Sequence, residues 1–186
     1  MRLIPSFFRK GGMAITAQEL LDSIQRDHFL NSMFSSYRRA LAYAKEKNVL
    51  DYGCGYGWGS FYLAETGRLV TGFDNDRERI ARAQNIFSRD NLVFTGDREC
   101  LRHQYDVICL FQVLQFLDAD NHGLQQIYDC LLPGGVLLLS SKSYYKHHVT
   151  AALDYMQGHG MQILFDNLFP LTKETDLVEI GFRRPA

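Results

Sequence analysis

The stretch Val49-Leu50-Asp51-Tyr52-Gly53-Cys54-Gly55-Tyr56-Gly57 joins a short apolar run to an acidic residue and a glycine-rich turn, and a helical pattern begins near Gly59. Glycines at such a turn take positive φ and let the backbone approach a ligand closely. A strand, a glycine turn and a helix in this order are typical of parallel sheets that bind nucleotide-like cofactors at a strand end. The stretch therefore predicts an α/β fold with a cofactor loop.

The same alternation continues along the chain. Short apolar runs predict strands at Val49–Tyr52, Leu69–Phe73, Leu92–Phe94, Val107–Phe111 and Val136–Ser141. Helical patterns lie at Gly59–Ala64, Arg77–Phe87 and Leu124–Leu131, the last ended by Pro133-Gly134-Gly135, and at Val149–Gln157. Two more apolar runs, Ile163–Phe169 and Leu177–Phe182, indicate a terminal hairpin. This order predicts a doubly wound, mostly parallel sheet with crossover helices.

Two helical patterns precede the first strand. Thr16-Ala17-Gln18-Glu19 has capping-box spacing, and a second apolar stripe runs from Met33 to Ala44. We expect residues 1–12 to form a flexible tail, residues 13–46 an N-terminal helical lid, and residues 47–186 the cofactor-binding core. His28 and Tyr37 are candidate residues of that lid, although helix packing is the plainer interpretation of both.

Acidic residues follow the next two strands and outline an adenosine. Asp74 ends the strand about 20 residues beyond the loop, where a carboxylate can accept from both ribose hydroxyls. Asp97 can accept from the adenine amine, with the amide of Arg98 available to a ring nitrogen. Each acid, taken alone, could instead cap a helix or lie in a loop. A dinucleotide fold is disfavoured because Trp58 occupies the place of its third glycine.

From Arg38 to Ser141 the chain resembles class I S-adenosylmethionine (SAM)-dependent methyltransferases. The resemblance is carried by VLDYGCGYG, GFDND, NLVFTGD, YDVICLFQVLQFL and LLPGGVLLLSS, in the family's order. It implies a seven-stranded sheet in the order 3-2-1-4-5-7-6 with strand 7 antiparallel, covered by the N-terminal helices. The segment YRRALAYAKEKNVLDYGCGYGWGS most resembles small-molecule and glycan-type methyltransferases.

The resemblance also implies roles for individual residues. It places Asp51 near the methionine amino group of SAM, Asp74 on the ribose and Asp97 at the adenine. Asn75 stands where the family usually has an apolar residue stacking on adenine, so Phe73, Arg98 or another side chain must supply that contact, or binding is weaker. The expected cofactor contacts are Asp51, Gly53, Cys54, Gly55, Gly57, Asp74, Asn75, Asp97, Arg98, Phe111 and Gln112.

The methyl acceptor is less defined. The segment after the fifth strand offers Tyr144, Tyr145, His147 and His148 as candidates to orient an acceptor or remove its proton, although such residues at a helix start more often form a wet surface. His147-His148 has no third ligand at metal-binding spacing. Phe111-Gln112-Val113-Leu114 lacks the Asn/Asp-Pro-Pro-aromatic motif of methyltransferases that act on amide-like or base nitrogens. The expected activity is therefore methyl transfer to a small-molecule or glycan-type acceptor, with S-adenosylhomocysteine (SAH) as the product.

Composition narrows the partners and the compartment. A net charge of -1 over 186 residues gives no electrostatic footprint for a polyanion, which disfavours nucleic acid. The four cysteines form no CxxC pair, and no run reaches the ~20 apolar residues of a membrane span, so we expect a cytoplasmic protein. The alternative to catalysis is a SAM- or SAH-binding protein that acts as a regulatory or assembly partner.

Overall fold

The computed structural model describes residues 28–117, 122–170 and 176–186, with side chains described from Phe34 onward. The expected tail at 1–12 and the helix expected from Thr16 lie outside these residues. The helices are α2 (His28–Ala44), α3 (Trp58–Leu63), α4 (Arg77–Ile86), α5 (His122–Cys130) and α6 (Lys146–Gly158). The strands are β1 (Asn48–Tyr52), β2 (Leu69–Phe73), β3 (Leu92–Thr95), β4 (Tyr105–Phe111), β5 (Leu131–Lys142), β6 (Gln162–Pro170) and β7 (Asp176–Arg183). Short 3-10 turns are η2 (Arg98–Arg102), η3 (Leu114–Phe116) and η4 (Ser143–Tyr145).

The strands form one seven-stranded sheet in the order β3-β2-β1-β4-β5-β7-β6. Strands β1 to β5 pair in parallel, whereas β7 is antiparallel to both β5 and β6. This arrangement confirms the predicted fold class and strand order. The chain reverses its direction of travel across the sheet between β1 and β4, and ligands of open parallel sheets bind at the carboxyl end of such a switch point.

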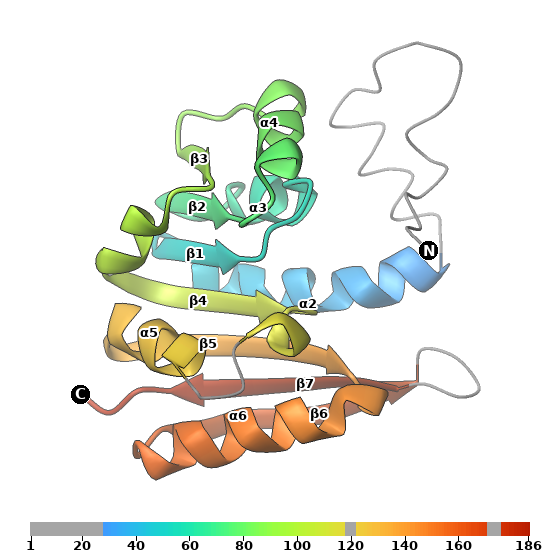
Figure 1. Ribbon diagram of the computed structural model, residues 1–186, viewed down its shortest axis with the longest axis vertical. Helices are drawn as coiled ribbons and strands as arrows, with labels where there is room; N and C mark the ends of the chain where they lie inside the picture. Colours follow the sequence, from blue (N-terminus) through green and yellow to red (C-terminus); the bar gives the residue numbers. More distant parts are fainter. Residues whose placement is uncertain (1–27, 118–121, 171–175) are drawn as a thin grey trace.

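Both faces of the sheet are covered by helices. In Figure 1, α2 runs behind the strands, whereas α5 and α6 lie in front of them. Strand β4 shows why both layers are needed: Val107 and Cys109 pack toward α2, α3 and α4, whereas Ile108 and Leu110 pack toward α5 and α6. Because β4 is apolar at every position from Val107 to Phe111, this part of the strand cannot leave either face in water.

The boundary between α5 and β5 differs from the sequence-based expectation. Pro133-Gly134-Gly135 does not separate a helix from a strand, because α5 already ends at Cys130 and β5 begins at Leu131. The three residues lie within β5 as an irregular stretch, where the pairing with β4 shifts register. Gly134 has φ +74 and donates its N–H to the carbonyl of Arg184, so the C-terminal segment supplies hydrogen bonds that the bulge would otherwise lack.

Helix α2 is part of the layer that covers the sheet. It packs on α3, β4 and β5, and Phe34, Tyr37, Ala40 and Ala44 are buried in the core on that side. This packing places Tyr37 at the carboxyl edge of the sheet. The expectation of a lid at residues 13–46 depends on residues 13–27 as well, and those lie outside the described residues.

Candidate functional site

A cavity of about 460 Å³ opens at the carboxyl ends of β1, β2 and β4. It lies at the switch point of the sheet, where the first glycine loop meets the ends of the neighbouring strands. The lining residues come from α2, the glycine loop and α3, the end of β2 with α4, and the end of β4. They are Tyr37, Tyr52–Tyr56, Trp58, Phe73–Asp76, Arg79, Phe111–Val113 and Phe116.

The glycine loop lines this cavity from Gly53 to Tyr56, whereas Gly57 is not among the lining residues. Gly53, Gly55 and Gly57 all have positive φ, at +77, +58 and +86. A Cβ on Gly53 would lie 2.2 Å from Cγ1 of Val113, whereas a Cβ on Gly55 would meet no atom within 4 Å. Gly53 is therefore required by packing as well as by conformation, and Gly55 leaves open space next to the backbone. Such a cradle fits a ligand that lies directly on the main chain.

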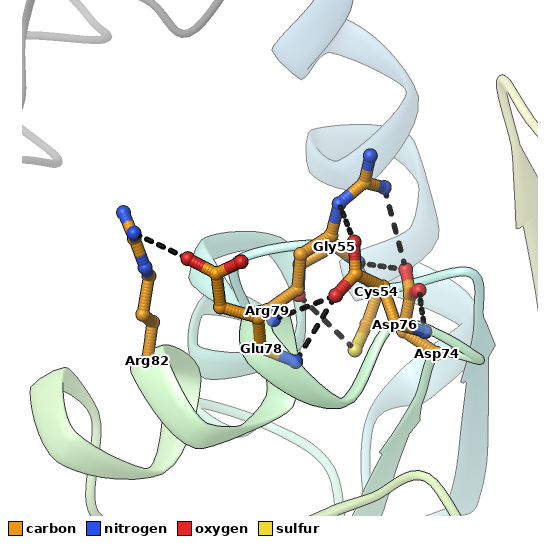
Figure 2. A network of polar contacts seen from close by, with 7 residues as sticks. All are labelled: Cys54, Gly55, Asp74, Asp76, Glu78, Arg79 and Arg82. Carbon is orange, nitrogen blue, oxygen red and sulfur yellow. Dashed lines mark hydrogen bonds and ion pairs between the residues drawn. The ribbon is translucent and has the colours of Figure 1, made fainter.

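Asp74 connects the loop to the start of α4. Figure 2 shows its carboxylate between the two segments: Oδ2 accepts from the N–H of Gly55 at 2.9 Å, and Oδ1 accepts from the N–H of Asp76 at 2.9 Å. Nη1 of Arg79 lies 3.8 Å from Oδ2. An ionised carboxylate has about four acceptor positions, so Asp74 keeps capacity for hydroxyl groups of a ligand.

Asp76 and Arg79 also line the cavity, and the sequence analysis did not identify them. Asp76 caps α4 by accepting from the N–H groups of Glu78 and Arg79, and Nε of Arg79 lies 3.2 Å from its Oδ2 (Figure 2). The Arg79 guanidinium lies 5.8 Å from the centre of the Tyr56 ring. An Asp directly before a helical pattern was the signal for the cap, but its place beside the loop depends on the tertiary structure.

Asp51 lies behind the cavity wall. The side chain is 1 % exposed, and its carboxylate accepts from Oγ of Ser60 at 2.6 Å and from the hydroxyl of Tyr37 at 3.2 Å. Burial raises the pKa of Asp51 to about 6; the hydrogen bonds from Ser60 and Tyr37 oppose this shift, and the charge of Asp74 adds to it. The expected contact of Asp51 with the amino group of SAM stays a prediction, since Tyr37 stands at the cavity surface in this structure.

Tyr37 belongs to the wall of the cavity itself. Its ring packs edge-on against Phe111, with centroids 4.8 Å apart, and against Trp58 at 4.9 Å. Burial, together with the charge of Asp51, raises its pKa well above the ordinary value, so the phenol stays protonated and donates to Asp51. Trp58 packs on Phe34 and Tyr37 and also lines the cavity.

The end of β4 contributes an unusual backbone conformation. Gln112 has φ +60, which is uncommon for a residue other than glycine. Its N–H donates to the carbonyl of Ser140 at 2.9 Å, its Nε2 donates to Oγ of Ser140 at 3.3 Å, and its own carbonyl accepts from Gln115. These contacts hold the turn so that Phe111 and Gln112 both face the cavity, with the 78 % exposed Phe116 also in its lining.

Other sequence candidates lie elsewhere. The carboxylate of Asp97 caps η2 by accepting from the N–H of Glu99 at 2.9 Å, and Arg98 donates to Gln126 in a groove beside α5. Neither is among the residues that line the cavity. Their adenine contacts therefore stay predictions. His28 is the first residue of α2, and its side chain is outside the described part of the chain.

The predicted acceptor residues lie in η4 and at the start of α6, at the same edge of the sheet. Tyr144 is 57 % exposed and its ring centre lies 4.4 Å from that of Tyr145, which in turn packs on His148. None of these three, nor His147, lines the described cavity. Within the described residues, no cluster of three His, Cys, Asp or Glu side chains could hold a metal ion, and no helix is long and apolar enough to cross a bilayer.

Sequence comparison places the chain among methyltransferases. The methyltransferase domain family matches residues 25–172. A malonyl-[acyl-carrier protein] O-methyltransferase of Enterobacter lignolyticus is 32% identical over 96 residues, which cover 50% of this chain and 38% of the relative. A ubiquinone biosynthesis O-methyltransferase of Coxiella burnetii is 27% identical over 124 residues, covering 61% and 51%. The chain thus spans about half the length, or less, of these curated relatives.

Solved structures share the fold. The N-methyltransferase NodS from Bradyrhizobium japonicum superposes with a TM-score of 0.73 at 19% identity, over 87% of this chain and 99% of NodS. The same enzyme in complex with SAH gives a TM-score of 0.71 at 17% identity, over 91% and 98%. Since the family match covers most of the chain and the strand order is that of this fold, the chain belongs to the SAM-dependent methyltransferase domain family.

Proposed function

We propose that the protein transfers a methyl group from SAM to a small-molecule or glycan-type acceptor by direct displacement. The observation that carries this proposal is the Asp74 carboxylate, which ties the glycine loop to α4 and faces a cavity at the switch point of the sheet. The O-methyltransferases among the sequence relatives support a small acceptor.

The residues divide between two ends of the cavity. We propose that Asp74 holds the ribose, that Gly53 and Gly55 follow the methionyl chain, and that Phe111 and Gln112 flank the reacting methyl. SAM supplies a methyl group on a positively charged sulfur, and this sulfur leaves readily as a neutral thioether. The protein then needs chiefly to align the acceptor with that methyl, and alignment can lower the barrier by ~7–11 kcal/mol.

The acceptor would enter on the aromatic side of the cavity, between Tyr37, Phe111 and Phe116. Tyr144, Tyr145, His147 and His148 follow β5 at the same edge, and we keep them as proposed acceptor contacts. Residues 13–46 remain the proposed cap over this opening. A net charge of -1 favours a small acceptor over nucleic acid, and four free cysteine thiols fit a reducing, cytoplasmic setting.

Calorimetric titration with SAM, SAH and NAD tests the cofactor. We expect SAM and SAH to bind and NAD not to bind. Asp74→Asn should weaken SAH binding roughly 10- to 100-fold, because a hydrogen bond to a charged group contributes ~1.5–3 kcal/mol. Asp90→Asn, at an exposed position after α4, is the matched control and should bind as the wild type does. Tight NAD binding without SAM binding would contradict the proposal.

Methyl transfer itself is tested with SAM labelled in the methyl group. Incubation with fractions of small metabolites and glycans should move label into one fraction, and Asp74→Asn should lower that transfer in parallel with its SAH affinity. Binding of SAH without transfer to any fraction would favour the alternative, a binding protein without catalysis.

A further inference from the structure

Glu179 of β7 is a buried carboxylate outside the cavity. It is 2 % exposed, and its neighbours in the strand, Val178 and Ile180, belong to the apolar core. A buried charge is costly unless it is paired and hydrogen-bonded, and removal of one partner leaves the other uncompensated. Its partners therefore indicate what the charge does in this fold.

Three side chains of α2 contact this carboxylate. Ser36 donates to Oε1 at 2.5 Å, Ser35 donates to Oε1 at 3.2 Å, and Nε of Arg39 lies 2.9 Å from Oε2. The Arg39 guanidinium also lies over the rings of Phe165 and Phe169 in β6, at 5.1 and 5.5 Å from their centres. Ser35, Ser36, Arg39 and Glu179 form what we call the Glu179 clasp, which fixes one turn of α2 on the antiparallel edge of the sheet.

Tyr37, the residue after Ser36 in α2, contacts the parallel part of the sheet. Tyr37 donates to Asp51 of β1, and its ring lies so close to Gly59 that a Cβ there would be 2.1 Å from its Cζ. Strands β5 and β4 separate β7 from β1, a span of roughly 14 Å at ~4.8 Å per strand. Consecutive residues of one helix thus engage two buried carboxylates on the same face of the sheet, and a slip of α2 would break both.

We propose that Glu179 is a positioning residue for the cofactor site: its clasp on α2 sets the place of Tyr37 in the cavity wall. This inference rests on the proposed function, because it takes the cavity as the site of SAM and SAH. Glu179 is not among the residues that line the cavity, and we infer that it acts through the register of α2 on the sheet.

A double-mutant cycle in SAH affinity tests the inference. The four proteins are the wild type, Glu179→Gln, Tyr37→Phe and the double variant, each titrated with SAH by calorimetry. We expect each single variant to bind about tenfold more weakly, and the double variant to bind no more weakly than the poorer single one. Glutamine keeps an acceptor for Ser36 but loses the charge that pairs with Arg39.

The outcomes separate positioning from mere stability. A double variant about 100-fold weaker than the wild type would show independent effects and overturn the inference, as would unchanged SAH affinity in Glu179→Gln. Should Glu179→Gln fail to fold, Arg39→Gln replaces it in the same cycle. Arg38→Gln, exposed and one residue away on the same helix, is its matched control and should bind as the wild type does. If the wild type itself binds no SAH, the proposed function fails, and the inference with it.

Discussion

Asp51 illustrates how burial changes the chemistry of a single carboxyl group. Its position before the glycine loop is conspicuous, yet the carboxylate is buried behind the cavity lining with Ser60 and Tyr37 as hydrogen-bond donors. Ionisation at this position is unfavourable because burial removes water from the charge, which is why the pKa is raised to about 6. The residue is therefore a pH-dependent element of stability.

The sign of this dependence follows from linkage. A carboxyl whose pKa is about 6 in the folded state and 3.8 when unfolded binds its proton more tightly in the folded state. Its contribution to stability is present below about pH 4 and is lost as the pH rises through about 6, by roughly 2–3 kcal/mol. Asp51→Asn should lose this dependence, because its side chain stays neutral throughout.

Urea unfolding at about pH 4.5 and about pH 7.5 measures the effect. The free energy of unfolding of Asp51→Asn minus that of the wild type should be larger at the higher pH, because only the wild type loses stability as the pH rises. An equal difference at both pH values would show that Asp51 titrates normally in the folded state.

At the scale of elements, apolar runs predicted the strands well, whereas Pro and Gly residues predicted the ends of helices and strands less well. The predicted strand Leu69–Phe73 has the same bounds as β2 in the structure, because the run is followed by the polar Asp74 at the carboxyl edge of the sheet. Pro133-Gly134-Gly135 was interpreted as a helix stop, although hydrogen bonds from the distant Arg184 make it part of β5. Local signals cannot report a partner that comes from the other end of the chain.

The contact between α2 and α3 gives a prediction at this scale. Alanine is normally better than glycine inside a helix, by ~1 kcal/mol. Gly59→Ala should nevertheless destabilise the protein by roughly 1–3 kcal/mol and weaken SAH binding, because its Cβ would lie 2.1 Å from Cζ of Tyr37, whose hydroxyl is held by Asp51.

Gly158→Ala, at the end of α6, is the matched control, because a Cβ there meets no atom within 4 Å. Thermal unfolding and SAH titration of both variants check the prediction. A Gly59→Ala protein as stable as Gly158→Ala would mean that α2 can move away from α3 without cost.

For the whole molecule, the sequence predicted the edge of the sheet that carries the site and only part of its wall. Asp74 was identified because it ends a strand at a known distance from the glycine loop. Tyr37 was named as a lid candidate, with helix packing as the plainer interpretation, and the Glu179 clasp was not foreseen, since Ser36 and Glu179 are 143 residues apart in sequence. Pairings of that range depend on the crossing of α2 over the sheet, which no local pattern encodes.

That long-range construction predicts how a ligand acts on the entire fold. The cavity wall combines α2, the loop after β1, the start of α4 and the end of β4, so unfolding any of these parts removes the site.

A ligand that binds only the folded state stabilises it by ~2.7 kcal/mol when its concentration is 100 times the dissociation constant. SAH at that concentration should therefore shift a single cooperative transition of the wild type to higher temperature. Asp74→Asn, scanned at the same SAH concentration, should shift much less, because that concentration is then only about 1 to 10 times its weakened dissociation constant. A first transition insensitive to SAH, followed by a shifted second one, would mean instead that part of the wall unfolds independently of the site.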